Sequence, residues 1–178
     1  MILRQDKEEI EWEKKIDHGT TFCGAIVGKD KTLLANVGDS RAYIYKDRKL
    51  TQVTKDDSKV QMLYDRGEIS SKEDMRFNRV SNQIYKALGF PGHDEPTFSV
   101  LENSKYDTLM LLSDGVSDFL SEHDIKIICD KTPREELAKA LIKAANYKKS
   151  RGPGKPGYYD VRNGGDDNAT SAVTFNDR

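Results

Sequence analysis

The chain has 178 residues, which is enough for one domain with a hydrophobic core and too short to predict two. Its 29 Lys and Arg residues balance 30 Asp and Glu residues, so the charge predicts no nucleic-acid partner and no anionic membrane partner. The longest apolar runs, LLANV and TLMLL, are far shorter than the roughly 20 residues that span a bilayer, and MILRQDKEEIEWEKK is too charged for a secretion signal. We therefore expect a cytoplasmic protein.

The first third of the chain changes from a helical to a strand pattern. Residues 3–16 are highly charged with scattered apolar residues, which predicts an exposed helix with one narrow packing face. The segments TTFCGAIVG, KTLLANVGD and RAYIYKDRKLTQV are rich in β-branched and aromatic residues and are separated by turn-forming residues. They predict three neighbouring antiparallel strands. In the third, Ala42 and Ile44 alternate with Tyr43 and Tyr45, so one face should be more buried than the other.

Residues 55–86 interrupt the strand pattern with a polar stretch. The segment DSKVQMLY has apolar residues at helical spacing, Gly67 suits the C-terminal cap, and Ser70 or Ser71 offers the next N-cap. This predicts a small helical excursion within one domain that comprises residues 1–178.

The second half resumes with strands and ends in helices and a last strand. PTFSVLE and DTLMLLSD predict strands, the second central and covered on both faces because it is continuously apolar. SEHDIKIICD predicts a helix that starts at Ser121 with acidic Asp124, and TPREELAKALIKAANYKK predicts one with Thr132, Pro133 and Glu135 as N-cap, first residue and capping-box acid. A Gly- and Pro-rich loop, SRGPGKPGYYDVRNGG, then leads to the strand NATSAVTF.

Strands in runs and helices in runs predict an α+β domain whose sheets are mainly antiparallel. Two cysteines, Cys23 and Cys129, lie inside apolar segments and form no CxxC pattern. Buried thiols are therefore expected, rather than a disulfide or a zinc site.

Three short sequence motifs, called words below, place an Asp beside an apolar run: Asp39 in NVGDSR, Asp114 in LLSDGVSD and Asp167 in GGDDNATS. Carboxylates gathered at strand ends are suitable ligands for Mg²⁺ or Mn²⁺, which prefer oxygen in octahedral geometry. Taken singly, each word is also typical of an ordinary turn, because Asp, Asn, Ser and Gly dominate turns.

The order of these words resembles the metal-dependent, 2C-type serine/threonine protein phosphatases in their bacterial form. The matching segments are GTTFCGAIV, ANVGDSRAYIY, LTQVTKDDSKVQMLYDRGEIS, IYKALG, LLSDGVSD and DDNATSAV. The resemblance extends from about Gly19 to Val173. It implies an antiparallel β-sandwich flanked by helices, with a binuclear Mn²⁺ or Mg²⁺ centre at one end.

The resemblance also implies roles for individual residues. Asp114 and Asp167 match ligands of the binuclear centre and are the expected catalytic pair. Asp39 and Asp118 match ligands of a weaker third metal, to which Asp114 is also a ligand. Each carboxylate should then lie where a strand stops. The implied reaction is metal-assisted hydrolysis, in which a hydroxide held by the metals attacks phosphorus in line. The implied partners are phosphorylated proteins and a cognate serine/threonine kinase.

The sequence departs from the family at its beginning. It contains no NED word, no DGxGG word with its metal-bridging Asp, and no N-terminal Arg that grips phosphate. We therefore expect an N-terminally truncated form that holds at most one loosely bound ion, since divalent affinity rises with ligand charge and site rigidity. Its activity alone should be weak.

Several residues outside the main words have two interpretations. Asp166 would tune the site or serve as an exposed turn residue. The Gly- and Pro-rich loop would meet a phosphopeptide through Arg151, Lys155, Arg162, Tyr158 and Tyr159, or be a surface insertion. The three histidines, His18, His93 and His123, fall in no matching word and are expected on the surface rather than as general acids.

Two further functional classes stay open at this point. A non-catalytic pseudophosphatase that acts as a regulatory binding module would explain the missing N-terminal words. An unrelated calcium-binding α+β domain would keep the Asp turns but would leave GTT and IYKALG unexplained.

Overall fold

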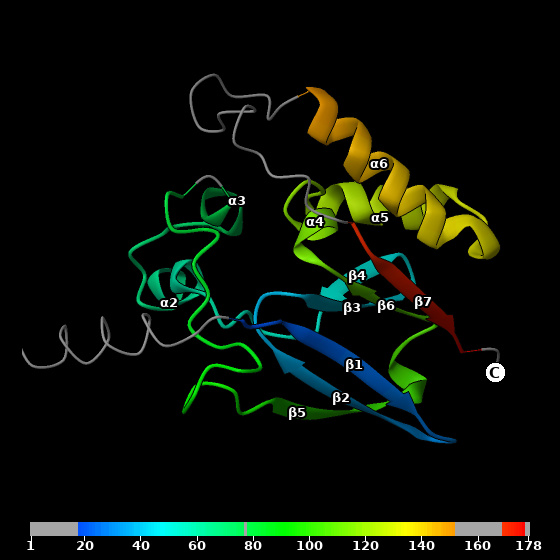
Figure 1. Ribbon diagram of the computed structural model, residues 1–178. Helices are drawn as coiled ribbons and strands as arrows, with labels where there is room; N and C mark the ends of the chain where they lie inside the picture. The colour runs from blue at the N-terminus through cyan, green and yellow to red at the C-terminus, as the bar shows by residue number, and fades with distance from the viewer. Residues whose placement is uncertain (1–17, 77, 152–168, 177–178) are drawn as a thin grey trace, which may run out of the picture.

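The structure is a computed structural model that describes residues 18–76, 78–151 and 169–176. Two antiparallel sheets form a β-sandwich with helices packed against one of them, which confirms the predicted α+β class (Figure 1). The first sheet has the order β1-β2-β5, from the strands Phe22–Val27, Lys31–Val37 and Thr97–Glu102. The second has the order β4-β3-β6-β7, from Lys49–Gln52, Arg41–Lys46, Thr108–Leu112 and Ser171–Phe175.

The prediction of three neighbouring antiparallel strands at the start of the chain is confirmed for β1 and β2, which pair antiparallel, and is wrong for the third strand. The chain crosses between the sheets at the turn after β2, so β3 pairs with β4 and β6 instead of with β2. The second neighbour of β2, on the side away from β1, is β5, about 65 positions further on, which no local pattern indicates. The expected turn after Lys46 is present. Asp47 and Arg48 both adopt a positive φ there, the geometry of a two-residue hairpin loop.

β3 is buried on both faces, which corrects the expectation of one buried face. Ala42 packs between the two sheets against Leu34, Tyr106 and Leu109. Tyr43 points the other way, into the larger cluster between the second sheet and the helices. The alternating residues of β3 therefore pack into two different apolar clusters, because helices cover the face of the sheet that was expected to contact solvent. β6 is central, as predicted, between β3 and β7.

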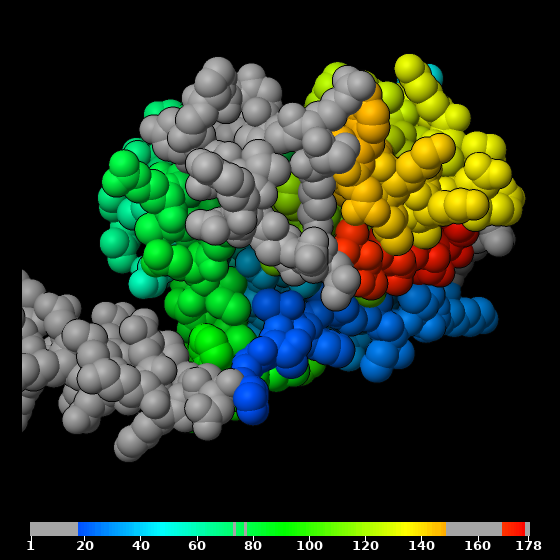
Figure 2. Space-filling view, turned by 45° about the horizontal axis from the view of Figure 1, so that its top comes forward, coloured from blue at the N-terminus to red at the C-terminus, as the bar shows by residue number. Residues whose placement is uncertain are grey.

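The helices that cover the second sheet follow β6 in order. They are α4 (Asp114–Ser117), α5 (Glu122–Lys131), the short 3₁₀ helix η3 (Arg134–Glu136) and α6 (Leu137–Arg151). In Figure 2, α6 lies directly over the red strand β7, while the blue strands form a separate layer below. Leu141 and Ala145 of α6 are fully buried against Met110 and Leu112 of β6.

The caps of the two long helices match the prediction only in part. Ser121 and Asp124 form the expected reciprocal capping box of α5. Thr132 is instead the extended C-cap of α5, and Pro133 occupies the N-cap of η3 without a side-chain bond. The predicted helix is therefore real, but its first turn is 3₁₀ and Thr132 does not cap it.

The outer face of the β1-β2-β5 sheet is apolar and exposed within the described ranges. Its exposed apolar side chains include Ile26, Leu33, Phe98 and Val100. The predicted helix at 3–16 and the Gly- and Pro-rich loop lie outside the described residues, apart from the end of α6. Among the residues described, no helix has the length and apolar character that crossing a membrane requires.

The helical excursion contains α2 (Lys59–Asp65) and α3 (Lys72–Met75) beside the sandwich (Figure 1). Gly67 follows α2 and has a φ of 73°. Its N–H donates to the Tyr64 carbonyl and the Glu68 N–H donates to the Leu63 carbonyl, which together form a Schellman motif. Ser71, one of the two predicted caps, accepts a hydrogen bond from the Asp74 N–H at 3.1 Å. A small cluster of Val60, Ile69 and Met75 holds the two helices together.

Candidate metal and phosphate site

Three of the four predicted metal-ligating residues gather at one end of the second sheet. β3 and β6 pair with Arg41 opposite Leu112, so the residues just beyond these positions, Asp39 and Asp114, come to the same edge. Asp114 is the first residue of α4 and Asp118 is its C-cap. Asp39 and Asp114 thus follow a strand end as predicted, but Asp118 ends a helix instead. Asp167 and Asp166 lie outside the described residues.

The carboxylates at this edge are close enough to affect one another's pKa values. Burial, followed by the carboxylates of Asp114 and Asp118, raises the pKa of Asp39 to about 7. Burial also raises the pKa of Asp118 to about 6, with Arg41 acting in the opposite direction and Asp114 adding to the rise. Crowded carboxylates resist ionisation unless a cation shares the site. The arrangement is therefore favourable for a positive charge.

The donor chemistry of this edge fits a hard divalent cation, because all three groups are carboxylates. Over residues 18–76, 78–151 and 169–176, however, no set of three or more His, Cys, Asp or Glu side chains is placed to hold a metal ion by itself. The described carboxylates would thus supply part of a coordination shell.

The turn that presents Asp39 depends on Gly38. Gly38 has a φ of 97°, and a Cβ built on it would lie 2.5 Å from Thr21 Cγ2 and 3.3 Å from Thr21 Cα. Its N–H donates to Asp57 Oδ2 at 3.0 Å, and its carbonyl accepts from the Asp57 N–H at 2.9 Å. Only glycine fits both the left-handed backbone and the contact with Thr21.

Replacing Gly38 with Ala is expected to lower the free energy of unfolding by about 2–3 kcal/mol, because it adds a steric clash to the cost of the positive φ. Gly67→Ala is the matched control. Gly67 also has a positive φ of 73°, but nothing lies within 4 Å of its Cβ position, so only the backbone cost of about 1 kcal/mol should appear. Urea denaturation of both variants measures the difference, and equal losses would show that the Thr21 contact is unimportant.

Arg41 links the strand edge to α4. Its Nε donates to both oxygens of Asp56 at 3.0 and 2.9 Å, and its Nη2 lies 2.6 Å from Asp56 Oδ2. Nη1 donates to the Ser117 carbonyl at 3.4 Å, and Nη2 also lies 3.9 Å from Asp118 Oδ1. The guanidinium therefore ties Asp56, which is 2% exposed, to the end of α4 that carries Asp118.

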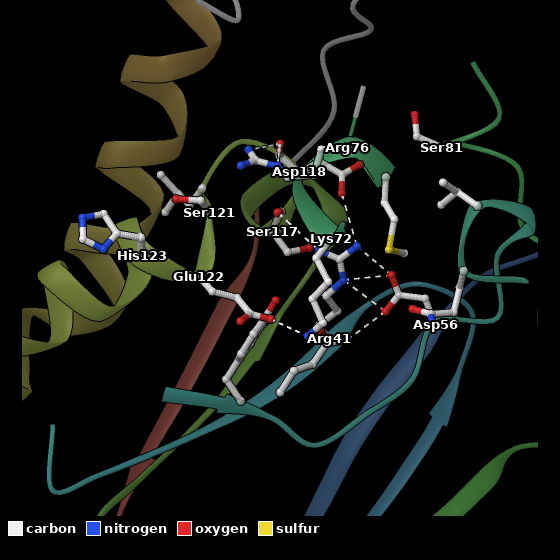
Figure 3. A pocket seen from close by; sticks show the side chains of 16 residues that line it. Arg41, Asp56, Lys72, Arg76, Ser81, Ser117, Asp118, Ser121, Glu122 and His123 are labelled. Carbon is white, nitrogen blue, oxygen red and sulfur yellow. Dashed lines mark hydrogen bonds and ion pairs between the residues drawn. The ribbon is translucent and has the colours of Figure 1, made fainter. Parts of the chain in front are cut away.

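A pocket of about 240 Å³ opens beside Asp118, between the excursion and the start of α5. Figure 3 shows Arg41 and Asp56 within it, with Lys72, Arg76 and Glu122 around it. Lys72 pairs with Glu122 at 2.7 Å, and Arg76 Nη2 donates to the Asp118 carbonyl at 2.6 Å. The lining thus mixes cations and anions that come from both the excursion and the sandwich.

The predicted exposure of the histidines is confirmed, and the two cysteines are less buried than predicted. His18, His93 and His123 are exposed, although His123 borders the pocket from the first turn of α5. Cys23 and Cys129 are free, partly buried thiols, and burial raises the pKa of each to about 11.

Sequence reasoning missed most of the cationic and supporting residues, namely Arg41, Asp56, Asp57, Lys72 and Arg76. Two signals were available in the sequence. Arg41 directly follows the GDS motif, and the adjacent pair Asp56-Asp57 directly precedes Ser58, the N-cap of α2.

Comparison with known sequences identifies the class. The sequence profile of the Protein phosphatase 2C family matches residues 2–143. Serine/threonine phosphatase stp of Listeria welshimeri is 38% identical over 129 residues, which are 72% of this chain and 51% of that protein. Serine/threonine protein phosphatase PstP of Mycobacterium tuberculosis is 34% identical over 93% of this chain and 29% of its own length.

Solved structures agree with the sequence comparison. Serine/threonine phosphatase Stp1 from Staphylococcus aureus superposes with a TM-score of 0.74 and 28% identity, over 96% of this chain and 65% of that one. The catalytic domain of PstP in complex with two manganese ions gives a TM-score of 0.65 and 32% identity, over 93% and 62%.

The chain therefore belongs to the protein phosphatase 2C family. It spans about half the length of the Listeria phosphatases that it matches. Membership excludes the alternative of an unrelated calcium-binding domain.

Proposed function

We propose that the chain carries part of the site of a Mn²⁺- or Mg²⁺-dependent phosphatase that removes phosphate from phosphoserine and phosphothreonine in proteins. The observation that carries this proposal is the group of carboxylates at the sheet edge beside an open pocket, Asp39, Asp114 and Asp118, where burial and the neighbouring Asp114 raise the pKa of both Asp39 and Asp118. A divalent ion bound there would neutralise charge on the phosphoryl oxygens and activate the attacking water.

The chain's own residues have distinct parts in this proposal. Asp114 and Asp167 are the catalytic metal ligands, and Asp39 and Asp118 serve a further, weaker metal position. Arg41 keeps the end of α4 at the site through its bonds to Asp56 and Ser117. The family resemblance, not the described geometry, supplies Asp167.

This chain by itself is proposed to bind a single ion weakly and to hydrolyse slowly. The described carboxylates do not complete a metal shell, and the sequence has no DGxGG word to provide a bridging Asp. A second candidate is a regulatory module that binds phosphoproteins at the pocket without hydrolysing them, because the described carboxylates do not complete a metal shell.

One experiment separates the two candidates. Hydrolysis of a phosphothreonine peptide is followed with and without Mn²⁺, for this chain and for a longer chain in which a family segment with NED and DGxGG precedes Met1. The enzyme proposal expects little turnover by the short chain and strong, Mn²⁺-dependent turnover by the longer one. Peptide binding with no hydrolysis by either chain would favour the regulatory module.

The excursion at 55–86 is proposed to act as a mobile flap over the substrate. Its apolar support is limited to Val60, Ile69 and Met75 with a few partly buried neighbours, and it provides Lys72 and Arg76 to the pocket. Segments with few buried contacts open at low free energy, which suits a substrate gate.

Amide hydrogen exchange is expected to be fast from Asp65 to Arg79 and slow in the strands around Ala35 and Leu111. In the longer chain, replacing this segment should change the choice among phosphopeptides more than the rate on a small aryl phosphate. Protection equal to that of the central strands, or equal losses on both substrates, would contradict the flap assignment.

A further inference from the structure

We propose that the adjacent pair Asp56-Asp57 is a positioning element that holds two of the metal carboxylates, Asp39 and Asp118, in register with each other. The inference rests on the proposed function, because it assigns a role toward the same metal site. Neither residue would touch the ion. Both are buried, with 2% and 7% exposure.

Asp57 acts on the Asp39 side. Its backbone N–H donates to the Gly38 carbonyl at 2.9 Å, and its carboxylate Oδ2 accepts from the Gly38 N–H at 3.0 Å. This reciprocal pair fixes both peptide groups of Gly38, the residue immediately before Asp39. The remaining oxygen, Oδ1, lies 3.4 Å from the Tyr85 hydroxyl and 3.8 Å from Lys86 Nζ, so the buried charge has a cation nearby.

Asp56 acts on the Asp118 side through Arg41. Three contacts of 2.6–3.0 Å orient the guanidinium, and Gln52 Nε2 donates to Asp56 Oδ1 at 3.1 Å. The oriented Arg41 then reaches Ser117 and Asp118 at the end of α4. Two neighbouring residues thus support two ligands that are 79 positions apart in the chain, as the numbering of Asp39 and Asp118 shows.

The same pair is the root of the excursion. Ser58, the next residue, accepts from the Gln61 N–H and caps α2, while the Asp57 carbonyl accepts from the Tyr85 N–H at 2.9 Å. The Lys59 N–H donates to the Gln83 carbonyl at 2.8 Å, which joins the two ends of the excursion. A movement of the excursion at this point would therefore displace Asp57 and alter the turn that presents Asp39.

The chain offers a matched set of variants that separates positioning from simple support. Asp57→Ala removes the side-chain bond to the Gly38 N–H but keeps the backbone bond, and Asp57→Asn keeps an acceptor of the same size. Ser58→Ala removes the helix cap one residue further on and leaves the Gly38 contacts intact. Mn²⁺ affinity is measured for each variant from free Mn²⁺ by electron paramagnetic resonance, together with exchange of the Gly38 amide.

The expected result is an affinity about tenfold weaker in Asp57→Ala, the range seen when outer-sphere partners of metal ligands are removed. Asp57→Asn should recover most of this loss and Ser58→Ala should show none, and Gly38 exchange should accelerate only in Asp57→Ala. If Asp57→Ala does not fold, the comparison of Asp57→Asn with Ser58→Ala decides, because a positioning role requires the Asn variant to be the weaker binder.

Two results overturn the inference, and they are distinguishable. If the wild-type chain binds Mn²⁺ and the Asp57 variants bind it with the same affinity, the positioning role is rejected and the proposed function stands. The same holds if Ser58→Ala loses as much Mn²⁺ affinity as Asp57→Ala. A wild-type chain that binds no Mn²⁺ would reject the proposed function, and the inference with it.

Discussion

Replacing Asp114 with Ala, or Asp167 with Ala, is expected to abolish Mn²⁺-dependent hydrolysis in the longer chain and to weaken Mn²⁺ binding by this chain more than about 100-fold. The reason is ligand loss at a shared ion, since even substitutions outside the coordination shell cost about 10- to 100-fold. Asp114 sits at the first position of α4, where its Oδ1 already accepts from the Gly115 N–H at 2.7 Å, so its position is set by the backbone.

Asp39→Ala is the control for this prediction. It should impair turnover while the two-metal core of the longer chain stays occupied, because Asp39 is assigned to the weaker third position. Metal content after gel filtration and kcat on a phosphothreonine peptide together measure this. Loss of both core metals in Asp39→Ala would show that the roles of the carboxylates are assigned wrongly.

Replacing Arg41 with Met is expected to lower the free energy of unfolding by about 3–5 kcal/mol, which is the second large effect. The substitution leaves Asp56 as an unpaired charge whose side chain is 2% exposed, and a buried charge without its partner is costly. Gln52 would remain as a single donor to Asp56. Arg41→Lys should lose less, since it keeps the charge but not the fork of donors.

Lys72→Met is the matched control for Arg41→Met, because it breaks an ion pair of similar length whose side chains are 53% and 45% exposed. An exposed pair contributes at most about 1 kcal/mol. Urea denaturation of the three variants compares them directly. Similar losses in Arg41→Met and Lys72→Met would mean that burial does not govern the Arg41 interaction.

The local patterns that could be predicted from the sequence are those that depend on nearby residues. The capping box of Ser121 and Asp124, the Gly67 helix end and the continuously apolar strand β6 each have their cause within a few positions. The family words also predicted that Asp39 and Asp114 would meet, and the pairing of β3 with β6 brings them to one edge.

The rest depends on contacts between distant residues. Nothing near β3 indicates that it leaves its neighbour β2 for the second sheet, because strand composition is the same in either sheet. The support of Gly38 by Asp57 and of α4 by Arg41 arises only after this crossing brings the segments together. Thr132 was misassigned because the residue that ends α5 is also suited to begin the next helix.

Calorimetric titration of this chain with Mn²⁺ tests the central claim most directly, that its carboxylates form part of a phosphatase metal site. The account predicts a single weak binding event that disappears in Asp114→Ala. Two tight sites in this chain, or binding that persists unchanged in Asp114→Ala, would contradict it.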